Sequence, residues 1–135
     1  MTLYGLEIYS SDIDDRGIDF IVRKYPNSYW DIQVKSSRTT NYIFIEKSKF
    51  YIKENFIVAL ALFNNNENPD IFLIPSTVWA TPDGMFVDRD YEGKISKPEY
   101  GINLSKKNYH KLDQFRFENM VTQIFKSQKM IDVDL

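Results

Sequence analysis

The run Phe-Ile-Val-Ala-Leu-Ala-Leu-Phe, residues 56–63, is the longest apolar stretch of the chain. It has no polar side chain, so a strand formed here must be buried on both faces. Runs of this kind are typical of interior strands in sheets that are covered by helices. The run is far shorter than the roughly 20 residues that a membrane-spanning helix needs. We therefore expect a mixed sheet centred on residues 56–63.

A turn and a second strand follow this run. The polar segment 64–69, Asn-Asn-Asn-Glu-Asn-Pro, is typical of a turn. Residues 71–74 are apolar again and end at Pro75. The whole segment therefore predicts an antiparallel hairpin, after which Ser76 is placed to cap a short helical turn.

The other elements follow from hydrophobic periodicity. Further strands are predicted at residues 3–9, 18–24, 29–35, 41–46, 85–88 and 102–104. Residues 47–54 fit either a short helix or a turn. Ser105 is expected to cap a C-terminal helix, whose apolar stripe comprises Leu112, Phe115, Met120, Val121, Ile124 and Phe125. The pattern predicts an α/β fold in which one domain, residues 1–135, has a mixed central sheet flanked by helices.

Composition excludes several kinds of site. The chain has no cysteine, so it forms neither a disulfide nor a thiolate metal centre. It has one histidine, His110, which lies in no catalytic motif. The net charge of −2 gives no global attraction to a polyanion. Lysines gather at two places, at Lys47, Lys49 and Lys53, and at Lys94, Lys97, Lys106, Lys107 and Lys111. The N-terminus has no signal-peptide pattern, so we expect a cytoplasmic protein without a membrane partner.

The chemistry-bearing residues lie in a predicted hairpin over residues 18–35. On its second strand, Gln33 and Lys35 share the polar face. In an antiparallel hairpin the numbers of paired residues have a constant sum. A loop centred on Pro26 places Asp19 opposite Gln33, and one centred on residue 27 places it opposite Lys35. A loop with an even number of residues would put Asp19 on the other face.

An acid, an amide and an ammonium group on one face form a candidate catalytic site. Asp19 and Gln33 could supply oxygen ligands to Mg²⁺, although the neutral amide binds the cation more weakly than an acid does. Lys35 could orient a water molecule or stabilise charge on a phosphate. The alternative is a cross-strand ion pair between Asp19 and Lys35 without catalytic function.

This pattern resembles the PD-(D/E)XK nuclease superfamily, in which an acid on one strand is followed by (D/E/Q)-x-K on the next. The segments 15–22, Asp-Arg-Gly-Ile-Asp-Phe-Ile-Val, and 32–37, Ile-Gln-Val-Lys-Ser-Ser, are similar to those of uncharacterised restriction-endonuclease-like bacterial domains with G-I-D and Q-V-K-S strands. Residues 71–76, ending in Ile-Pro-Ser, fit more loosely. The resemblance implies a restriction-endonuclease-like fold and a DNA-cleaving nuclease, with Asp19 and Gln33 as metal ligands and Lys35 as the catalytic lysine.

The sequence departs from the superfamily at two points. Such nucleases usually begin with a helix that contributes a Glu to the metal site, whereas here the first predicted element is a strand carrying Glu7. Gln33 also stands where an acid is usual, and Asp31 on the same face is a candidate to assist. The departures suggest a degenerate nuclease, or a non-catalytic module that binds DNA or a protein. They also suggest that a homodimer or a partner subunit supplies the helix.

Overall fold

The computed structural model describes residues 6–10, 17–24, 27–38, 42–63, 68–93 and 95–126. It contains eight strands in these residues: β1 (Leu6–Ser10), β2 (Phe20–Lys24), β3 (Ser28–Ser37), β4 (Tyr42–Glu46), β5 (Phe56–Leu62), β6 (Asp70–Pro75), β7 (Phe86–Arg89) and β8 (Glu99–Asn103). Short 3₁₀ helices are η3 (Lys47–Lys49), η4 (Ser76–Ala80) and η5 (Tyr109–Phe115). The helix α1 (Phe117–Val121) continues into a π-helical turn, η6 (Thr122–Lys126).

The larger sheet has the strand order β1-β2-β3-β5-β6. Its pairs are antiparallel except for β3 and β5, which run parallel from Asp31 opposite Phe56 to Ser37 opposite Leu62. A parallel pair needs a long crossover connection. Here the crossover contains β4 and η3, and β4 joins a second, antiparallel sheet of order β4-β8-β7.

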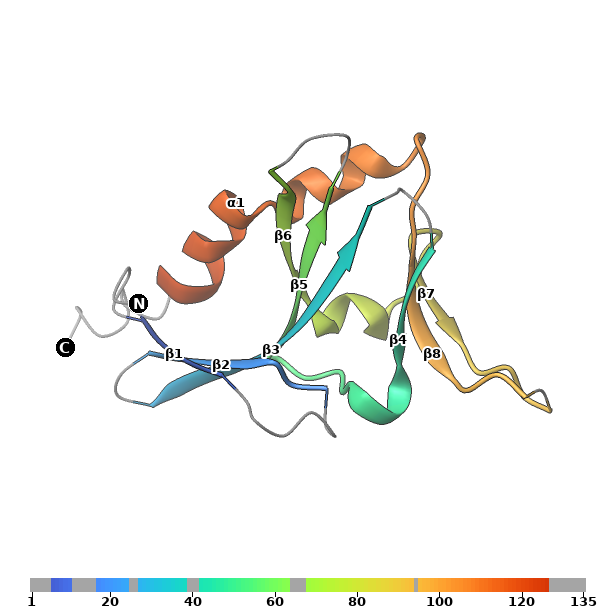
Figure 1. Cartoon of the computed structure of the whole chain (residues 1–135), viewed down its shortest axis with the longest axis horizontal. Helices are drawn as coiled ribbons and strands as arrows, with labels where there is room; N and C mark the ends of the chain where they lie inside the picture. Colours follow the sequence, from blue (N-terminus) through green and yellow to red (C-terminus); the bar gives the residue numbers. More distant parts are fainter. Residues whose placement is uncertain are drawn as a thin grey trace.

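Figure 1 shows a layered arrangement, with the C-terminal helices on one side of the larger sheet and the smaller sheet on the other. The helix η4 lies between the two sheets. The fold is thus a small mixed α/β domain with two sheets and few helices, and the prediction of a mixed sheet is confirmed at this level. The apolar run 56–63 does form an interior strand, but a second sheet rather than helices covers one of its faces.

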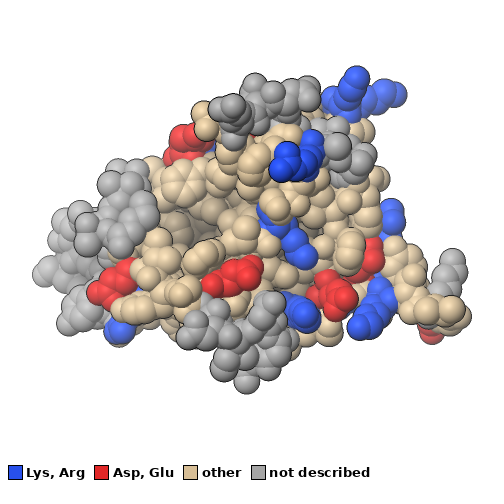
Figure 2. Space-filling view, in the orientation of Figure 1, with Lys and Arg blue, Asp and Glu red and all other residues tan. Residues whose placement is uncertain are grey.

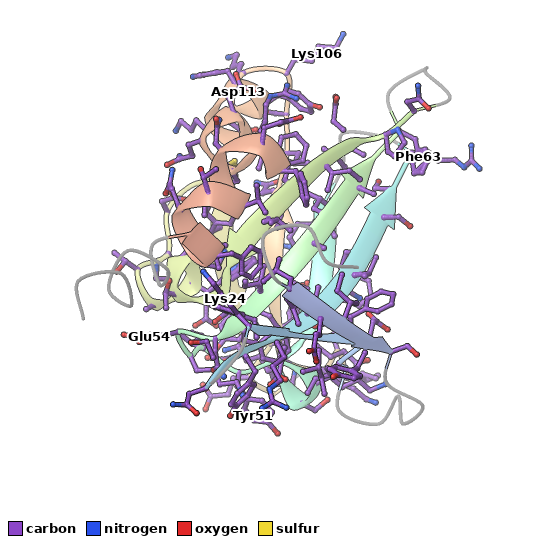
Figure 3. All side chains as sticks on the ribbon, turned by 90° about the vertical axis from the view of Figure 1, so that its left-hand side faces the viewer. Lys24, Tyr51, Glu54, Phe63, Lys106 and Asp113 are labelled. Carbon is purple, nitrogen blue, oxygen red and sulfur yellow. The ribbon has the colours of Figure 1, made fainter. Side chains whose placement is uncertain are left out.

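Aromatic side chains from both sheets fill the space between them. Trp79 of η4 is 1% exposed and packs edge-on against Phe50 and Phe86, with ring centroids 5.4 and 5.3 Å away. On the opposite face, Trp30 of β3 meets Phe125 edge-on at 4.7 Å. Lys24 of β2 donates a hydrogen bond to the carbonyl of Phe125, which also links the sheet to the end of the helical segment (Figure 3).

The C-terminal segment differs from the single helix that the periodicity predicts. It is divided into η5, α1 and η6, with Arg116 extended between the first two. The apolar stripe nevertheless faces the core: Leu112, Phe115, Met120, Val121 and Phe125 are buried, and Ile124 is partly buried against them. Ser105 is not the cap, since η5 begins at Tyr109 and its N-cap is Asn108. Among the helices of the described segments, none has the length and apolar character that crossing a membrane requires.

Ser76 has a different role from the helix cap expected of it. Pro75 is the N-cap of η4, and no side chain caps that helix. Ser76 is fully buried, and its hydroxyl accepts from the Lys53 amide at 2.9 Å and donates to the Lys53 carbonyl at 2.6 Å. The residue therefore attaches the end of the crossover to the end of β6.

Replacing this hydroxyl should destabilise the fold. Ser76→Ala removes the described acceptor of the Lys53 amide and one of the two donors to the Lys53 carbonyl, which also accepts from the Phe56 amide. The loss should lower the free energy of unfolding by about 1–3 kcal/mol. Urea denaturation followed by circular dichroism measures the change. Thr77→Ala, at the neighbouring exposed position, is the control and should stay within about 0.5 kcal/mol of wild type. Equal stabilities for the two variants would contradict the attachment.

Candidate functional site

The hairpin register fixes which residues form the candidate site. Lys24 pairs with Ser28 and Phe20 with Ile32, so the loop is centred on Pro26. The register with a loop centred on Pro26, one of the two odd-loop registers considered from the sequence, is therefore confirmed. Asp19 adds a local irregularity, because its amide donates to the Ile32 carbonyl at 2.9 Å although Ile32 already faces Phe20. Two consecutive residues thus face one, as in a β-bulge, a device that redirects side chains.

The bulge places the Asp19 carboxylate beside β3. Asp19 directly precedes β2, and its Oδ2 accepts a hydrogen bond from the Val34 amide at 2.7 Å. The carboxylate therefore occupies the position that a backbone carbonyl would take in a longer ladder, and this bond holds the side chain in one orientation. No donor among the described residues is bonded to Oδ1.

A pocket of about 260 Å³ opens next to this carboxylate. It is lined by Gly17, Asp19, Gln33, Val34, Lys35, Phe44, Glu46 and Lys49. All three site residues predicted from the sequence, Asp19, Gln33 and Lys35, are therefore brought together. The pocket also receives residues from β4 and η3, which belong to the crossover.

Gln33 is the most constrained of the three. Its side chain is 7% exposed, and its Oε1 is buried with no hydrogen-bond partner in the described part of the chain. A buried amide oxygen without a donor costs about 1–3 kcal/mol. The side chain lines the pocket, so a cation or a donor bound there would satisfy the oxygen.

Two lysines line the same pocket. Lys35 Nζ lies 5.8 Å from the centre of the Phe44 ring, near the outer limit of a cation–π contact. Neither Lys35 nor Lys49 forms an ion pair with any residue in the described ranges. The cross-strand pair between Asp19 and Lys35, the alternative considered from the sequence, is therefore not formed. Among the described residues, no carboxylate competes with an anion for either ammonium group through an ion pair.

Glu46 was not recognised as a site residue from the sequence. On β4, Ile43 and Ile45 point into the core, and Phe44 and Glu46 lie on the opposite face. That alternation is visible in the sequence. What the sequence does not reveal is that the crossover brings this face of β4 to the start of β2, where Glu46 lines the pocket.

Gly17 allows the chain before β2 to pack closely against η3 at the pocket. Its φ of +72° lies in the region that favours glycine. A Cβ at this position would lie 2.4 Å from the Lys49 carbonyl oxygen and 2.8 Å from Lys49 Cβ. Two physical reasons therefore explain why a glycine stands at position 17: its backbone has a positive φ, and it lies too close to η3 for a side chain.

The other polar residues considered from the sequence lie elsewhere. Asp31 is buried and forms an ion pair with Lys53 at 2.9 Å, so its carboxylate is neutralised away from the pocket. Glu7 is exposed on β1 and accepts a hydrogen bond from Tyr9. In the first lysine cluster, Lys47 forms ion pairs with Asp88 and Asp90. Lys49 is thus the only member of that cluster that is not in an ion pair with a described residue.

The donor set fits a hard divalent cation with few protein ligands. Oxygen atoms of carboxylates and amides suit Mg²⁺, which usually keeps several waters and takes one or two carboxylates from the protein. The pocket offers Asp19, Glu46 and the unsatisfied Gln33 oxygen. Within the described ranges, no group of three or more His, Cys, Asp and Glu side chains is arranged to hold a metal.

Comparisons with protein-family models, curated proteins and solved structures gave no match.

Gly17→Ala should disturb the pocket, and Gly93→Ala is its matched control. Both glycines have a positive φ, +72° and +75°, but nothing lies within 4 Å of a Cβ placed on Gly93. Each substitution should cost about 1–2 kcal/mol of unfolding free energy for the backbone conformation. Gly17→Ala should cost a further 1–3 kcal/mol or so for the overlap with Lys49. Equal losses in urea denaturation would show that Gly17 does not approach η3 this closely.

Proposed function

We propose that the chain is a metal-dependent phosphodiesterase acting on DNA, with a fold of the restriction-endonuclease-like, PD-(D/E)XK type, or a degenerate relative of such an enzyme. The observation that carries the proposal is that Gln33, whose buried Oε1 has no described partner, lines one pocket with Asp19 and Lys35. These three residues come from the two sequence segments on which the resemblance to the superfamily rests.

The roles of the side chains follow from their chemistry. Asp19 Oδ1 and Gln33 Oε1 are acceptor atoms, and they would hold Mg²⁺. When bound, that ion acts as a Lewis acid towards phosphate oxygens and lowers the pKa of a coordinated water. The Val34 amide keeps the Asp19 carboxylate in place through its bond to Oδ2, so little ordering remains to be done on binding.

Lys35 acts on the phosphate and on the attacking water. Its ammonium group donates hydrogen bonds only, so it orients a water oxygen or stabilises negative charge on phosphate oxygens. In the hydrolysis, the water oxygen forms a bond to phosphorus and gives up one proton, one P–O ester bond breaks, and the leaving oxygen takes up one proton, so that protons balance overall. Phe44 lines the same pocket, and the centre of its ring lies 5.8 Å from Lys35 Nζ.

The contact with DNA would be local. On the face that Figure 2 shows, basic and acidic side chains are interspersed rather than collected in one field. Lys35 and Lys49 are the basic residues of the pocket, and the exposed Lys106, Lys107 and Lys111 lie beyond it, on or just before η5. Phosphate contacts by a few lysines give weak binding that depends strongly on salt.

A second candidate function is a non-catalytic module that keeps this sheet and binds DNA or a protein. The amide at position 33 favours it, since a neutral ligand holds a divalent cation less firmly than an acid does. In this case the pocket would bind a phosphate through Lys35 and Lys49, without hydrolysis. Dimerisation or a partner subunit would then provide the remaining contact surface.

Cleavage of plasmid DNA tests the catalytic role. Supercoiled DNA with Mg²⁺ or Mn²⁺ should be nicked by wild type, and Lys35→Ala should lower the rate by about 10²–10³-fold, as for the loss of one electrostatic donor. Lys111→Ala, exposed on η5, is the control and should retain the wild-type rate. Activity that survives Lys35→Ala would place the chemistry elsewhere, and an inactive wild type that still binds DNA would favour the non-catalytic module.

Metal binding can be tested without turnover. Because a ligand that binds only the folded state stabilises it, Mn²⁺ should raise the Tm of wild type in differential scanning fluorimetry. Asp19→Asn should remove this shift, since the carboxylate becomes a neutral amide. Asp113→Asn, at an exposed residue of η5 paired with Arg116, should keep it. A shift that persists in Asp19→Asn would contradict the assignment of Asp19 as a ligand.

A further inference from the structure

We propose that Glu46 is the second carboxylate ligand of the cation site, in the place of the acid that the Gln-x-Lys strand lacks. The inference rests on the proposed function, since it names a further ligand for the same metal. Nothing in the local sequence around Asp19 or Gln33 points to this residue. Its assignment comes from the tertiary structure, because β4 belongs to the other sheet.

The first argument is the excess of unpaired acceptors in the pocket. Glu46 is partly buried, and its one described hydrogen bond is a long one, from the Ser48 hydroxyl at 3.4 Å. Glu46 lines the same pocket as Asp19, whose Oδ1 has no described donor, and as Gln33, whose buried Oε1 has no described partner. Three oxygen-bearing side chains therefore line one pocket, and few of their acceptor atoms are bonded to described donors although Lys35 and Lys49 line it too. A cation satisfies all three together, and two carboxylates with one neutral oxygen suit Mg²⁺ or Mn²⁺.

The second argument concerns the other charged groups near Glu46. Lys35 and Lys49 line the pocket, but neither approaches Glu46 closely enough for an ion pair. Across the strand pair, Glu46 lies opposite Glu99. Glu99 accepts hydrogen bonds from the hydroxyl groups of Tyr42 and Tyr91. It is not among the residues that line the pocket. Of these two neighbouring acids, Glu46 is therefore the one available to a ligand.

The third argument is that the backbone on both sides of Glu46 is fixed. Up to and including Glu46, β4 is paired with β8. Directly after it, the Lys47 amide donates a hydrogen bond to the Pro98 carbonyl at 3.1 Å. After it, η3 is covered by Gly17 at a separation that leaves no room for a Cβ. Such support on rigid elements is what a preorganised metal ligand requires. The segment with Asp19 and the segment with Glu46 are thus held against each other.

Isothermal titration with Mn²⁺ tests the assignment. Wild type should bind, Asp19→Asn should lose binding, and Glu46→Gln should bind at least about tenfold more weakly. Glu118→Gln, on the exposed side of α1, is the matched control and should bind as wild type does. In the Glu46→Gln background, Gln33→Glu returns one carboxylate to the pocket, and this double variant should recover most of the affinity.

The outcomes separate the two proposals. If wild type binds and Asp19→Asn does not, but Glu46→Gln keeps full affinity, Glu46 is not a ligand and the proposed function stands. If wild type binds no Mn²⁺, the metal-dependent function falls, and the ligand assignment falls with it. The Tm without metal distinguishes a structural role: Glu46→Gln should not lower it, and a clear decrease would mean that Glu46 stabilises the fold through a contact of its own.

Discussion

The parallel pairing of β3 with β5 is the constraint on which the candidate site depends. Two adjacent parallel strands cannot be joined by a tight turn, so the chain must leave the sheet after Ser37 and return at Phe56. In this protein the connection is not a helix. It forms β4 and η3, and it brings Glu46 and Lys49 to the place where β2 begins beside β3. The local residues of the site and the residues of the crossover meet for this topological reason.

The end of the crossover is held by polar contacts rather than by apolar packing alone. The backbone amide and carbonyl of Lys53 are both hydrogen-bonded to the Ser76 hydroxyl. The Lys53 side chain forms an ion pair with the buried Asp31. One residue thereby connects β3, the crossover and the β6–η4 junction. Removing the Lys53 side chain would leave the buried Asp31 carboxylate without its described ion pair, which is costly for a buried charge. The Ile-Pro-Ser segment is explained by this contact and has no direct part in the pocket.

The sequence predicted the parts of the structure that depend on local periodicity. Strands over residues 18–24, 29–35 and 71–74 lie within one or two residues of β2, β3 and β6, because alternation and terminating prolines are local signals. The odd loop was one of the registers obtained by counting residues across one hairpin. The count also placed Asp19 opposite Gln33, whereas the Asp19 amide is bonded to the Ile32 carbonyl and Asp19 precedes β2. The second sheet did not follow, since an apolar run shows that both faces are buried but not whether helices or strands cover them. Glu46 was missed for the same reason, and the division of the C-terminal helix at Arg116 has no marker such as glycine or proline at that point.

The charge balance of the pocket gives a reason for an amide at position 33. The pocket is lined by two carboxylates, Asp19 and Glu46, and by two lysines. If both carboxylates were ligands, their combined charge of −2 would balance the charge of a divalent cation. An acid at position 33 would add a third carboxylate to a volume of about 260 Å³, and like charges at such separations raise the cost of the unliganded state. Gln33 keeps an oxygen at the same place without that charge, and its burial holds the oxygen in position. If Glu46 is the ligand that we propose, the amide at position 33 and the carboxylate at position 46 belong to one arrangement, with the second acid on β4 instead of β3.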